Sequence, residues 1–196
     1  NHGSVRHAGV SLLPGEERGT QMTYEEVVDQ INQIRRFGNL AGVEVAGRML
    51  KALGSPQAGI PLIHIAGTNG KGSVSAFLCA ILREAGLRVG MFTSPHLVDF
   101  RERIQINGEM ISKEDTQRIG VQLLAMDFGV QPTMFDVTLA MAILYFKEQR
   151  CDVMILETGL GGRLDATNAV GVPDVTVITK IGYDHMAVLG NTLAEI

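Results

Sequence analysis

The sequence predicts an α/β fold in which helices flank a mostly parallel sheet and a phosphate-binding loop (P-loop) follows one of the strands. Three observations support this fold class. Short apolar runs of strand length alternate with segments of helical periodicity. A glycine cluster separates the first apolar run from the helical segment after it. Chains that alternate strands with helices build parallel sheets covered by helices, and 196 residues suffice for one well-buried domain.

Two helices are expected before the first strand. Thr23 and Glu26 form a capping-box pattern ahead of apolar residues at helical spacing, which predicts a helix over 23–36. The same spacing predicts a second helix over 43–53. The apolar run at 61–66 precedes the glycine cluster and is typical of a buried parallel strand. A helix over 71–85 and a strand over 88–92 complete this half.

The second half repeats the alternation. Apolar and polar residues alternate over 103–107, which predicts a strand suited to a sheet edge, with a turn at Asn107-Gly108. Ser112 with Asp115 predicts the start of a helix that continues to about residue 128. The remaining predicted elements are an apolar helix over 135–149 and two buried strands over 152–157 and 174–179.

The two ends of the chain differ from its middle. Residues 1–21 show no sustained periodicity, and we expect a leader or a disordered extension there. The domain is then expected to occupy residues 22–196. Residues 192–196 have a helical pattern, and an end inside a helix suggests a domain truncated at its C-terminus.

The composition argues against several classes of protein. The formal net charge of −4 gives no reason to expect nucleic-acid binding. No run of about 18 apolar residues is present, so no membrane span is expected. Cys79 and Cys151 lie in apolar segments outside any CxxC pair, which is typical of buried, reduced thiols in a cytoplasmic protein.

The glycine cluster has the composition of a phosphate loop. Backbone N–H groups of such a loop surround phosphate oxygens, and the next helix directs its N-terminus at the anion. Lys71 is positioned to reach the β- and γ-phosphates and Ser73 to help bind Mg²⁺. The string departs from the general GxxxxGK[ST] pattern, so a glycine-rich turn without a ligand stays open. The predicted loop consists of Gly67, Thr68, Asn69, Gly70, Lys71, Gly72 and Ser73.

The string GTNGKGS resembles the phosphate loop of the Mur-ligase-like superfamily, and most of all that of the folylpolyglutamate synthase and dihydrofolate synthase family. Three further segments follow in the family's order. They are FTSPHL (92–97) with FRERI after it, ETGLGGRLDATN (157–168), and IGYDH (181–185) with Leu189-Gly190 after it. The resemblance covers about residues 22–196, and it implies an ATP-binding domain like the central domain of Mur ligases.

This resemblance implies roles for individual residues. Thr68–Lys71 would surround ATP, Ser94, Glu157 and His185 would hold Mg²⁺ together with Ser73, and Lys71 and His185 would be catalytic. Glu157 ends a buried strand at the carboxyl edge of the sheet, where an unpaired carboxylate is costly and where ligands of α/β sheets bind. The alternative is a carboxylate paired with Arg163 or another basic group. Oxygen ligands favour Mg²⁺, and Mn²⁺ is a possible substitute.

The resemblance also implies a pterin site. Its contacts would come from a loop near 40–43, from Thr133–Asp136 and from Leu164–Ala166. The family usually has Glu where Asp136 stands, so Asp136 either shifts the site or positions the helix after it. Phe135 is either a stacking surface for a pterin ring or a core residue. The predicted substrate-binding residues are Thr133, Phe135, Asp136, Leu164, Asp165 and Ala166.

Three other residues are ambiguous. His64 lies on a predicted buried strand, which favours a hydrogen-bonded core histidine over a ligand. His96 belongs to the SPHL segment and is a weaker candidate for the site. Lys180 is either a phosphate contact or a surface lysine.

The implied activity is an ATP-dependent ligation of L-glutamate to a folate or dihydropteroate carboxylate. The γ-phosphoryl group passes to the carboxylate, and the amine of glutamate then attacks the acyl phosphate. Relatives carry a carbamylated lysine shortly after the IGYDH segment and a C-terminal domain that helps to bind glutamate. We therefore expect this chain to turn over poorly or not at all, and the full-length protein to be a monomer.

Three other functions stay open. A Mur-type ligase would act on a UDP-linked cell-wall precursor, a nucleotide-binding module would not turn over, and a generic P-loop kinase or ATPase would not need glutamate. If the chain belongs to a folate ligase, the sequence leaves open whether that enzyme is a folylpolyglutamate synthase alone or also glutamylates dihydropteroate.

Overall fold

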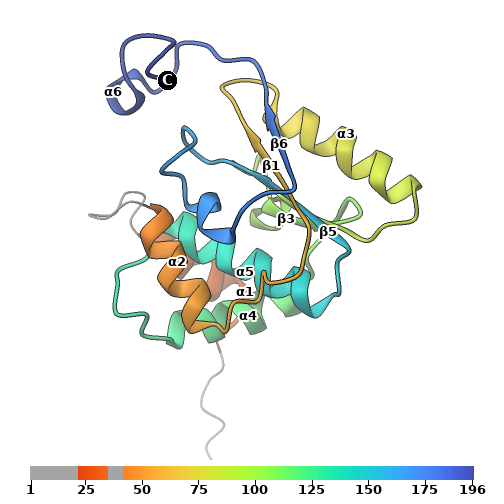
Figure 1. The fold of residues 1–196 in the computed structure, drawn as a ribbon. Helices are drawn as coiled ribbons and strands as arrows, with labels where there is room; N and C mark the ends of the chain where they lie inside the picture. The colour runs from red at the N-terminus through yellow and green to blue at the C-terminus, as the bar shows by residue number, and fades with distance from the viewer. Residues whose placement is uncertain (1–21, 35–41) are drawn as a thin grey trace, which may run out of the picture.

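The computed structural model describes residues 22–34 and 42–196. The expected leader at 1–21 lies outside the described residues, as do residues 40 and 41 of the loop assigned to the pterin and residues 35 and 36 of the helix predicted over 23–36. That helix ends earlier than predicted, at Gln33, because the backbone of Ile34 is extended. Within the described part the structure is an α/β fold, as the alternating pattern predicts (Figure 1).

A six-stranded sheet forms the centre, in the order β4-β3-β2-β5-β1-β6. The pairs β2–β5, β5–β1 and β1–β6 are parallel, whereas β3 and β4 form an antiparallel hairpin at one edge. The turn at Asn107-Gly108 joins this hairpin, with both residues at positive φ. The strands are β1 (Leu62–Ala66), β2 (Val89–Phe92), β3 (Ile104–Ile106), β4 (Glu109–Met110), β5 (Val153–Glu157) and β6 (Val175–Ile178).

Helices cover the two faces of the sheet unequally. On one face, a large apolar cluster joins residues of α1, α2, α4 and α5 to alternate residues of the strands. On the other face, a smaller cluster packs under α3 alone. The helices are α1 (Tyr24–Gln33), α2 (Gly42–Ala52), α3 (Lys71–Glu84), α4 (Lys113–Ala125), α5 (Met134–Glu148) and α6 (Met186–Leu189), with 3-10 turns η1 (Phe100–Arg103) and η2 (Ala166–Val170).

Side-chain caps predicted from the sequence set the start of two helices, α1 and α4. Thr23 and Glu26 make the predicted capping box at α1. The Ser112 hydroxyl accepts from the Asp115 N–H at the start of α4. Each cap satisfies backbone donors that the first turn of a helix leaves unpaired. The sequence-based starts of these helices are therefore confirmed, although α4 ends three residues before the predicted residue 128.

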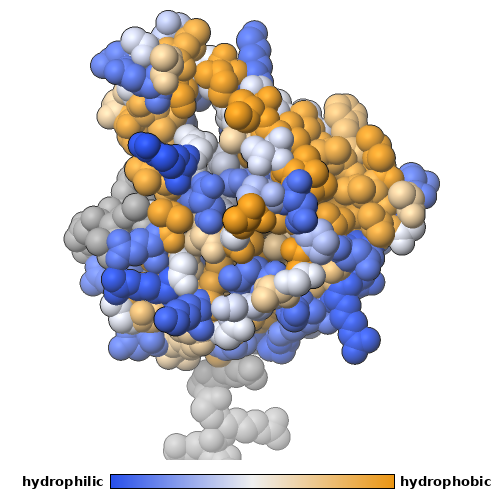
Figure 2. Space-filling model, in the orientation of Figure 1, coloured by the Kyte–Doolittle hydropathy of each residue, from blue (hydrophilic) through white to orange (hydrophobic). Residues whose placement is uncertain are grey.

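Strand β6 differs from its prediction as a buried strand. It pairs with β1 alone, and Val175 and Ile178 are 50% and 69% exposed. The neighbouring helix α3 also exposes Phe77 and Ile81. Figure 2 shows apolar residues gathered over this part of the surface. An apolar run is buried only where other elements cover it, and no described element covers this face of β6.

Two smaller points complete the comparison with the sequence. Residues 192–196 form hydrogen-bonded turns and not the expected helix. Cys79 and Cys151 are both buried free thiols, as predicted. No helix within 22–34 or 42–196 is long and apolar enough to cross a bilayer.

Candidate nucleotide and substrate site

The carboxyl ends of the parallel strands bring the predicted site residues to one edge of the sheet. The phosphate loop follows β1, Ser94 lies two residues after β2, and Glu157 ends β5. Helix α6 lies beyond the carboxyl ends of β1 and β6 (Figure 1). Ligands of open α/β sheets bind at this edge.

The phosphate loop needs its glycines. Gly70 adopts a φ of 87° directly before α3, and Gly67 has a φ of 138°. A Cβ on Gly67 would overlap the Thr179 hydroxyl. The N–H groups of Thr68 and Asn69 donate to the Lys180 carbonyl at 3.0 and 3.2 Å, so this side of the loop packs against the chain after β6. The first turn of α3 has no side-chain cap, which leaves its N-terminal amides available to an anion.

Lys71 lies over the loop that it follows. Its Nζ donates to the Gly67 carbonyl at 2.7 Å and the Thr68 carbonyl at 3.4 Å. The lysine borders an open cavity of about 200 Å³. The residues that line the cavity include Gly67 and Thr68 of the predicted phosphate loop, Gly159–Gly162, Asp184 and His185.

Glu157 is a buried carboxylate with few partners among the described residues. The residue is 4% exposed, and its Oε2 accepts one hydrogen bond, from the Ser94 N–H at 3.1 Å. Burial raises the pKa of this carboxyl, while the Ser94 N–H and the Lys71 charge act in the opposite direction. No described residue forms an ion pair with it, so the pairing with Arg163 is not seen. A bound cation would offset the cost of this buried charge.

The other two predicted metal ligands, Ser73 and His185, are exposed side chains for which no contact with Glu157 is seen. Ser73 is exposed in the first turn of α3. His185 begins α6 at a φ of 47°, and its half-exposed ring has Nε2 3.8 Å from Asp184 Oδ2. Within the described ranges no three His, Cys, Asp or Glu side chains form a group suited to a metal ion. The structure thus brings Ser94 into contact with Glu157, and it places His185 in the lining of the same cavity as Lys71. The ligand set of Ser73, Ser94, Glu157 and His185 stays a prediction.

The residues predicted near the start of α5 have structural partners. Asp136 is 1% exposed and accepts from the Thr133 N–H and hydroxyl at 2.8 and 2.7 Å, as the capping box of α5. Burial raises the pKa of Asp136, and Asp165 adds to the rise. Asp136 therefore positions the helix, the second of the two roles left open. Phe135 packs edge-on against Phe92 with ring centroids 5.4 Å apart.

The loop after β5 meets the start of α5. A Cβ on Gly159 would lie 2.6 Å from the Phe135 ring, so only glycine fits there. Leu164 is 59% exposed, whereas Asp165 and Ala166 are buried. Ala166 packs against the backbone of Gly42 in α2. The predicted pterin residues therefore gather in one region, with Leu164 the one that is open to solvent.

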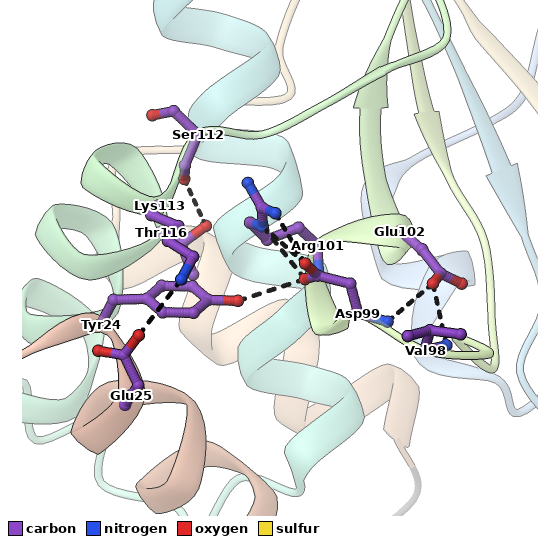
Figure 3. A network of polar contacts seen from close by, with 9 residues as sticks. All are labelled: Tyr24, Glu25, Val98, Asp99, Arg101, Glu102, Ser112, Lys113 and Thr116. Carbon is purple, nitrogen blue, oxygen red and sulfur yellow. Dashed lines mark hydrogen bonds and ion pairs between the residues drawn. The ribbon is translucent and has the colours of Figure 1, made fainter.

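A polar network fixes the chain between Ser94 and β3 (Figure 3). The Glu102 carboxylate accepts from three successive N–H groups, those of Leu97, Val98 and Asp99, at 2.7–2.9 Å. Asp99 in turn binds the Arg101 guanidinium and the Tyr24 hydroxyl of α1. The Arg101 guanidinium holds the pKa of Asp99 at about 2.

The structure adds residues that sequence reasoning missed. The Thr158 hydroxyl, next to Glu157, is buried without a hydrogen-bond partner in the described part of the chain. Leu160, Gly161 and Asp184 line the cavity. All four belong to the ETGLGGRLDATN and IGYDH segments, so the motif match was the signal that could have found them. His96, the weaker candidate for the site, is not among the residues that line the cavity. Its Nδ1 accepts from Arg103 Nε at 2.7 Å.

The chain is similar to known proteins over most of its length. The Mur ligase middle domain family matches residues 65–195. The dihydrofolate synthase/folylpolyglutamate synthase of Bacillus subtilis is 45% identical over 181 residues, which are 88% of this chain and 42% of that protein. The chain thus spans less than half the length of this curated relative.

Two solved structures share the fold. An FPGS complex with AMPPCP and folate superposes with a TM-score of 0.79 at 36% identity, covering 89% of this chain and 44% of the other. The Escherichia coli FolC complex with DHPP and ADP superposes with a TM-score of 0.79 at 33% identity, covering 89% and 42%. The match of the family model over residues 65–195 and the similarity to these synthases show that this chain belongs to the Mur ligase middle domain family and, within it, to the folylpolyglutamate and dihydrofolate synthase family.

Proposed function

We propose that this chain is the nucleotide-binding part of an ATP-dependent ligase that joins L-glutamate to the carboxylate of a folate or dihydropteroate. The observation that carries the proposal is the cavity between Lys71 of the phosphate loop and Gly159–Gly162 of the loop after β5. Lys71 is the residue of this lining that would bind the triphosphate. Gly159, in the same lining, lies against the ring of Phe135, one of the predicted pterin residues. The related structures that contain AMPPCP with folate, and ADP with DHPP, support this pairing of ligands.

The residues present fit a divalent cation in part. Glu157 supplies a buried carboxylate that has one hydrogen bond, from the Ser94 N–H, and no ion pair within the part of the chain that the structure describes. Mg²⁺, or Mn²⁺ in its place, would neutralise phosphate charge there. Ser73, which is exposed in the first turn of α3, and His185, which lines the cavity, complete the ligand set that we propose, each after a change of side-chain position.

The protein's own groups then favour phosphoryl transfer by position and charge. Lys71 and the amides of α3 stabilise the negative charge that develops on the transferred group. The substrate carboxylate attacks the γ-phosphorus, and the bond to the bridging oxygen breaks to release ADP. The glutamate amine next attacks the acyl carbon, an N–H proton is lost, and phosphate leaves. We propose that His185, which lines the cavity, is a catalytic residue together with Lys71.

The test is ADP release in the presence of Mg²⁺ and ATP, with tetrahydrofolate or dihydropteroate, each with and without glutamate. It is made on this chain and on a chimera in which the Bacillus subtilis relative supplies the rest of its length. We expect the chimera to release ADP only when pterin carboxylate and glutamate are both present, and this chain to do so poorly. The pterin that serves decides between one activity and two.

Either of two results would overturn the proposal. ADP release that needs neither substrate would indicate a generic ATPase. Release that needs a UDP-linked sugar acid would indicate a Mur-type ligase. We expect the active protein to be cytoplasmic. We also expect it to be a monomer, and sedimentation of the chimera would check its oligomeric state.

A further inference from the structure

A buried chain of hydrogen bonds links the strand that carries the phosphate loop to the loop after β5. It begins at His64 in β1, three residues before Gly67, and the residue is 7% exposed. The His64 Nε2 lies 2.7 Å from the Thr167 hydroxyl oxygen. That hydroxyl donates to Asp165 Oδ1 at 2.5 Å. Three side chains from two separate segments therefore form one connected group.

The chemistry of this group fixes the tautomer of the histidine. The Thr167 hydroxyl has one proton, and it gives that proton to Asp165, which as a carboxylate can only accept. The Thr167 oxygen must then accept from His64, so Nε2 carries the proton of the neutral ring. Burial lowers the pKa of His64, with the Asp165 charge acting in the opposite direction. A neutral ring that donates through Nε2 satisfies both partners.

Asp165 is the point from which the loop is held. Its Oδ2 accepts from the N–H groups of Gly159 and Leu160 at 2.9 and 3.0 Å. Its Oδ1 accepts from the Thr167 N–H at 3.0 Å as well as from the hydroxyl. Gly159 and Leu160 line the same cavity as Lys71. The orientation of Asp165 therefore determines where this wall of the cavity lies.

We propose that His64 is a positioning residue that holds Asp165 through Thr167 and so fixes the pterin side of the cavity relative to the phosphate loop. The inference rests on the proposed function, since it assigns the Asp165 loop to the pterin carboxylate substrate. His64 touches neither ligand in this account. It acts through Thr167, and its removal should weaken pterin binding more than ATP binding.

Two substitutions separate this role from simple packing. His64→Gln keeps an N–H donor near the place of Nε2, whereas His64→Leu fills similar space without a donor. In the active chimera we expect His64→Leu to raise the KM for the pterin about tenfold, the equivalent of about 1.4 kcal/mol, with the KM for ATP changed less than about twofold. Thr167→Val should have the same effect, and the double variant should be no worse than either single one. His64→Gln should restore most of the pterin KM.

Amide hydrogen exchange on this chain provides a readout that needs no activity. Exchange at Gly159 and Leu160 should be faster in His64→Leu than in wild type and return towards wild type in His64→Gln. Unchanged exchange in His64→Leu would overturn the proposal, whatever the enzyme does. Faster exchange with equal rises in both KM values, or with a fall in kcat alone, would show a merely structural role and overturn it too. If the chimera makes no glutamate-dependent product, the proposed function fails separately, and the exchange result alone decides whether His64 holds the loop.

Discussion

Two buried carboxylates stand at the same edge of the sheet, and they differ in how far the protein satisfies them. Asp165 accepts four hydrogen bonds, from the N–H groups of Gly159, Leu160 and Thr167 and from the Thr167 hydroxyl. Among the described residues, Glu157 accepts one, from the Ser94 N–H. Both residues are less than 10% exposed. The fold therefore supplies hydrogen-bond donors to both oxygens of Asp165, whereas the described residues supply Glu157 with a single donor.

The difference separates a structural role from a binding role. A buried polar group that is fully hydrogen-bonded stabilises the loop around it, whereas a buried charge with one partner destabilises the fold unless something else binds it. The Asp165 region therefore shapes the site, and the Glu157 region is where we place the cation. The two should respond to mutation in opposite ways.

The largest expected effect is at Asp165. Asp165→Ala leaves buried donors of three residues without an acceptor, and we expect it to lower the free energy of unfolding by about 3 kcal/mol. Urea denaturation followed by circular dichroism measures this. Asp152→Ala is the matched control, because that carboxylate is exposed and accepts one N–H bond, from Arg88. Equal losses in the two variants would contradict the structural role of Asp165.

Glu157→Gln should have the opposite sign. The amide keeps the shape and the acceptor for the Ser94 N–H but removes a charge that burial disfavours. We expect the free energy of unfolding at pH 7, without metal or nucleotide, to equal or exceed that of wild type. The same urea experiment tests it, with Glu109→Gln on the exposed strand β4 as control. A clear loss of stability in Glu157→Gln alone would show that the ionised carboxylate stabilises the fold.

The pH dependence sharpens the same point. The folded-state pKa of Glu157 is raised, so the native protein keeps this proton to a higher pH than the unfolded chain does. Stability then falls as pH rises from about 4.3, the ordinary pKa of Glu, towards the raised value. The advantage of Glu157→Gln over wild type should therefore grow from pH 4 to pH 7. The difference cancels the contribution of Asp136, whose pKa is also raised. An advantage that shrinks with pH would contradict the assignment.

Local rules in the sequence predicted most of the fold. The predicted caps at Thr23 and Ser112 each lie within four residues, and the apolar runs of β1, β2 and β5 need no knowledge of the rest of the chain. Burial of β6 could not be predicted in this way. Its apolar run is like that of β5, but β5 lies between two strands and β6 pairs with one. Neighbours in space, which the run itself does not encode, decide which of them is covered.

The candidate site divides along the same line. The end of β5 placed Glu157 at the carboxyl edge of the sheet, and the motif drew attention to Asp165. The sequence could not show that Asp165 is satisfied, because its link to His64 spans about a hundred residues of chain. For Asp136, the spacing Thr133-x-x-Asp136 already indicated a capping box, and the structure contains that box. A pterin contact at this position stays a prediction.

The most direct test of the account is the Mg²⁺ dependence of nucleotide binding, measured by calorimetry with a non-hydrolysable ATP analogue on wild type and Glu157→Gln. We expect Mg²⁺ to tighten binding about tenfold or more in wild type, equivalent to at least about 1.4 kcal/mol, and to have little effect in the variant. Binding without Mg²⁺ should be similar in both proteins or slightly tighter in Glu157→Gln, which lacks a negative charge near the phosphates. If Mg²⁺ tightened binding equally in both, Glu157 would not hold the cation, and the contrast between the two carboxylates would have no bearing on function.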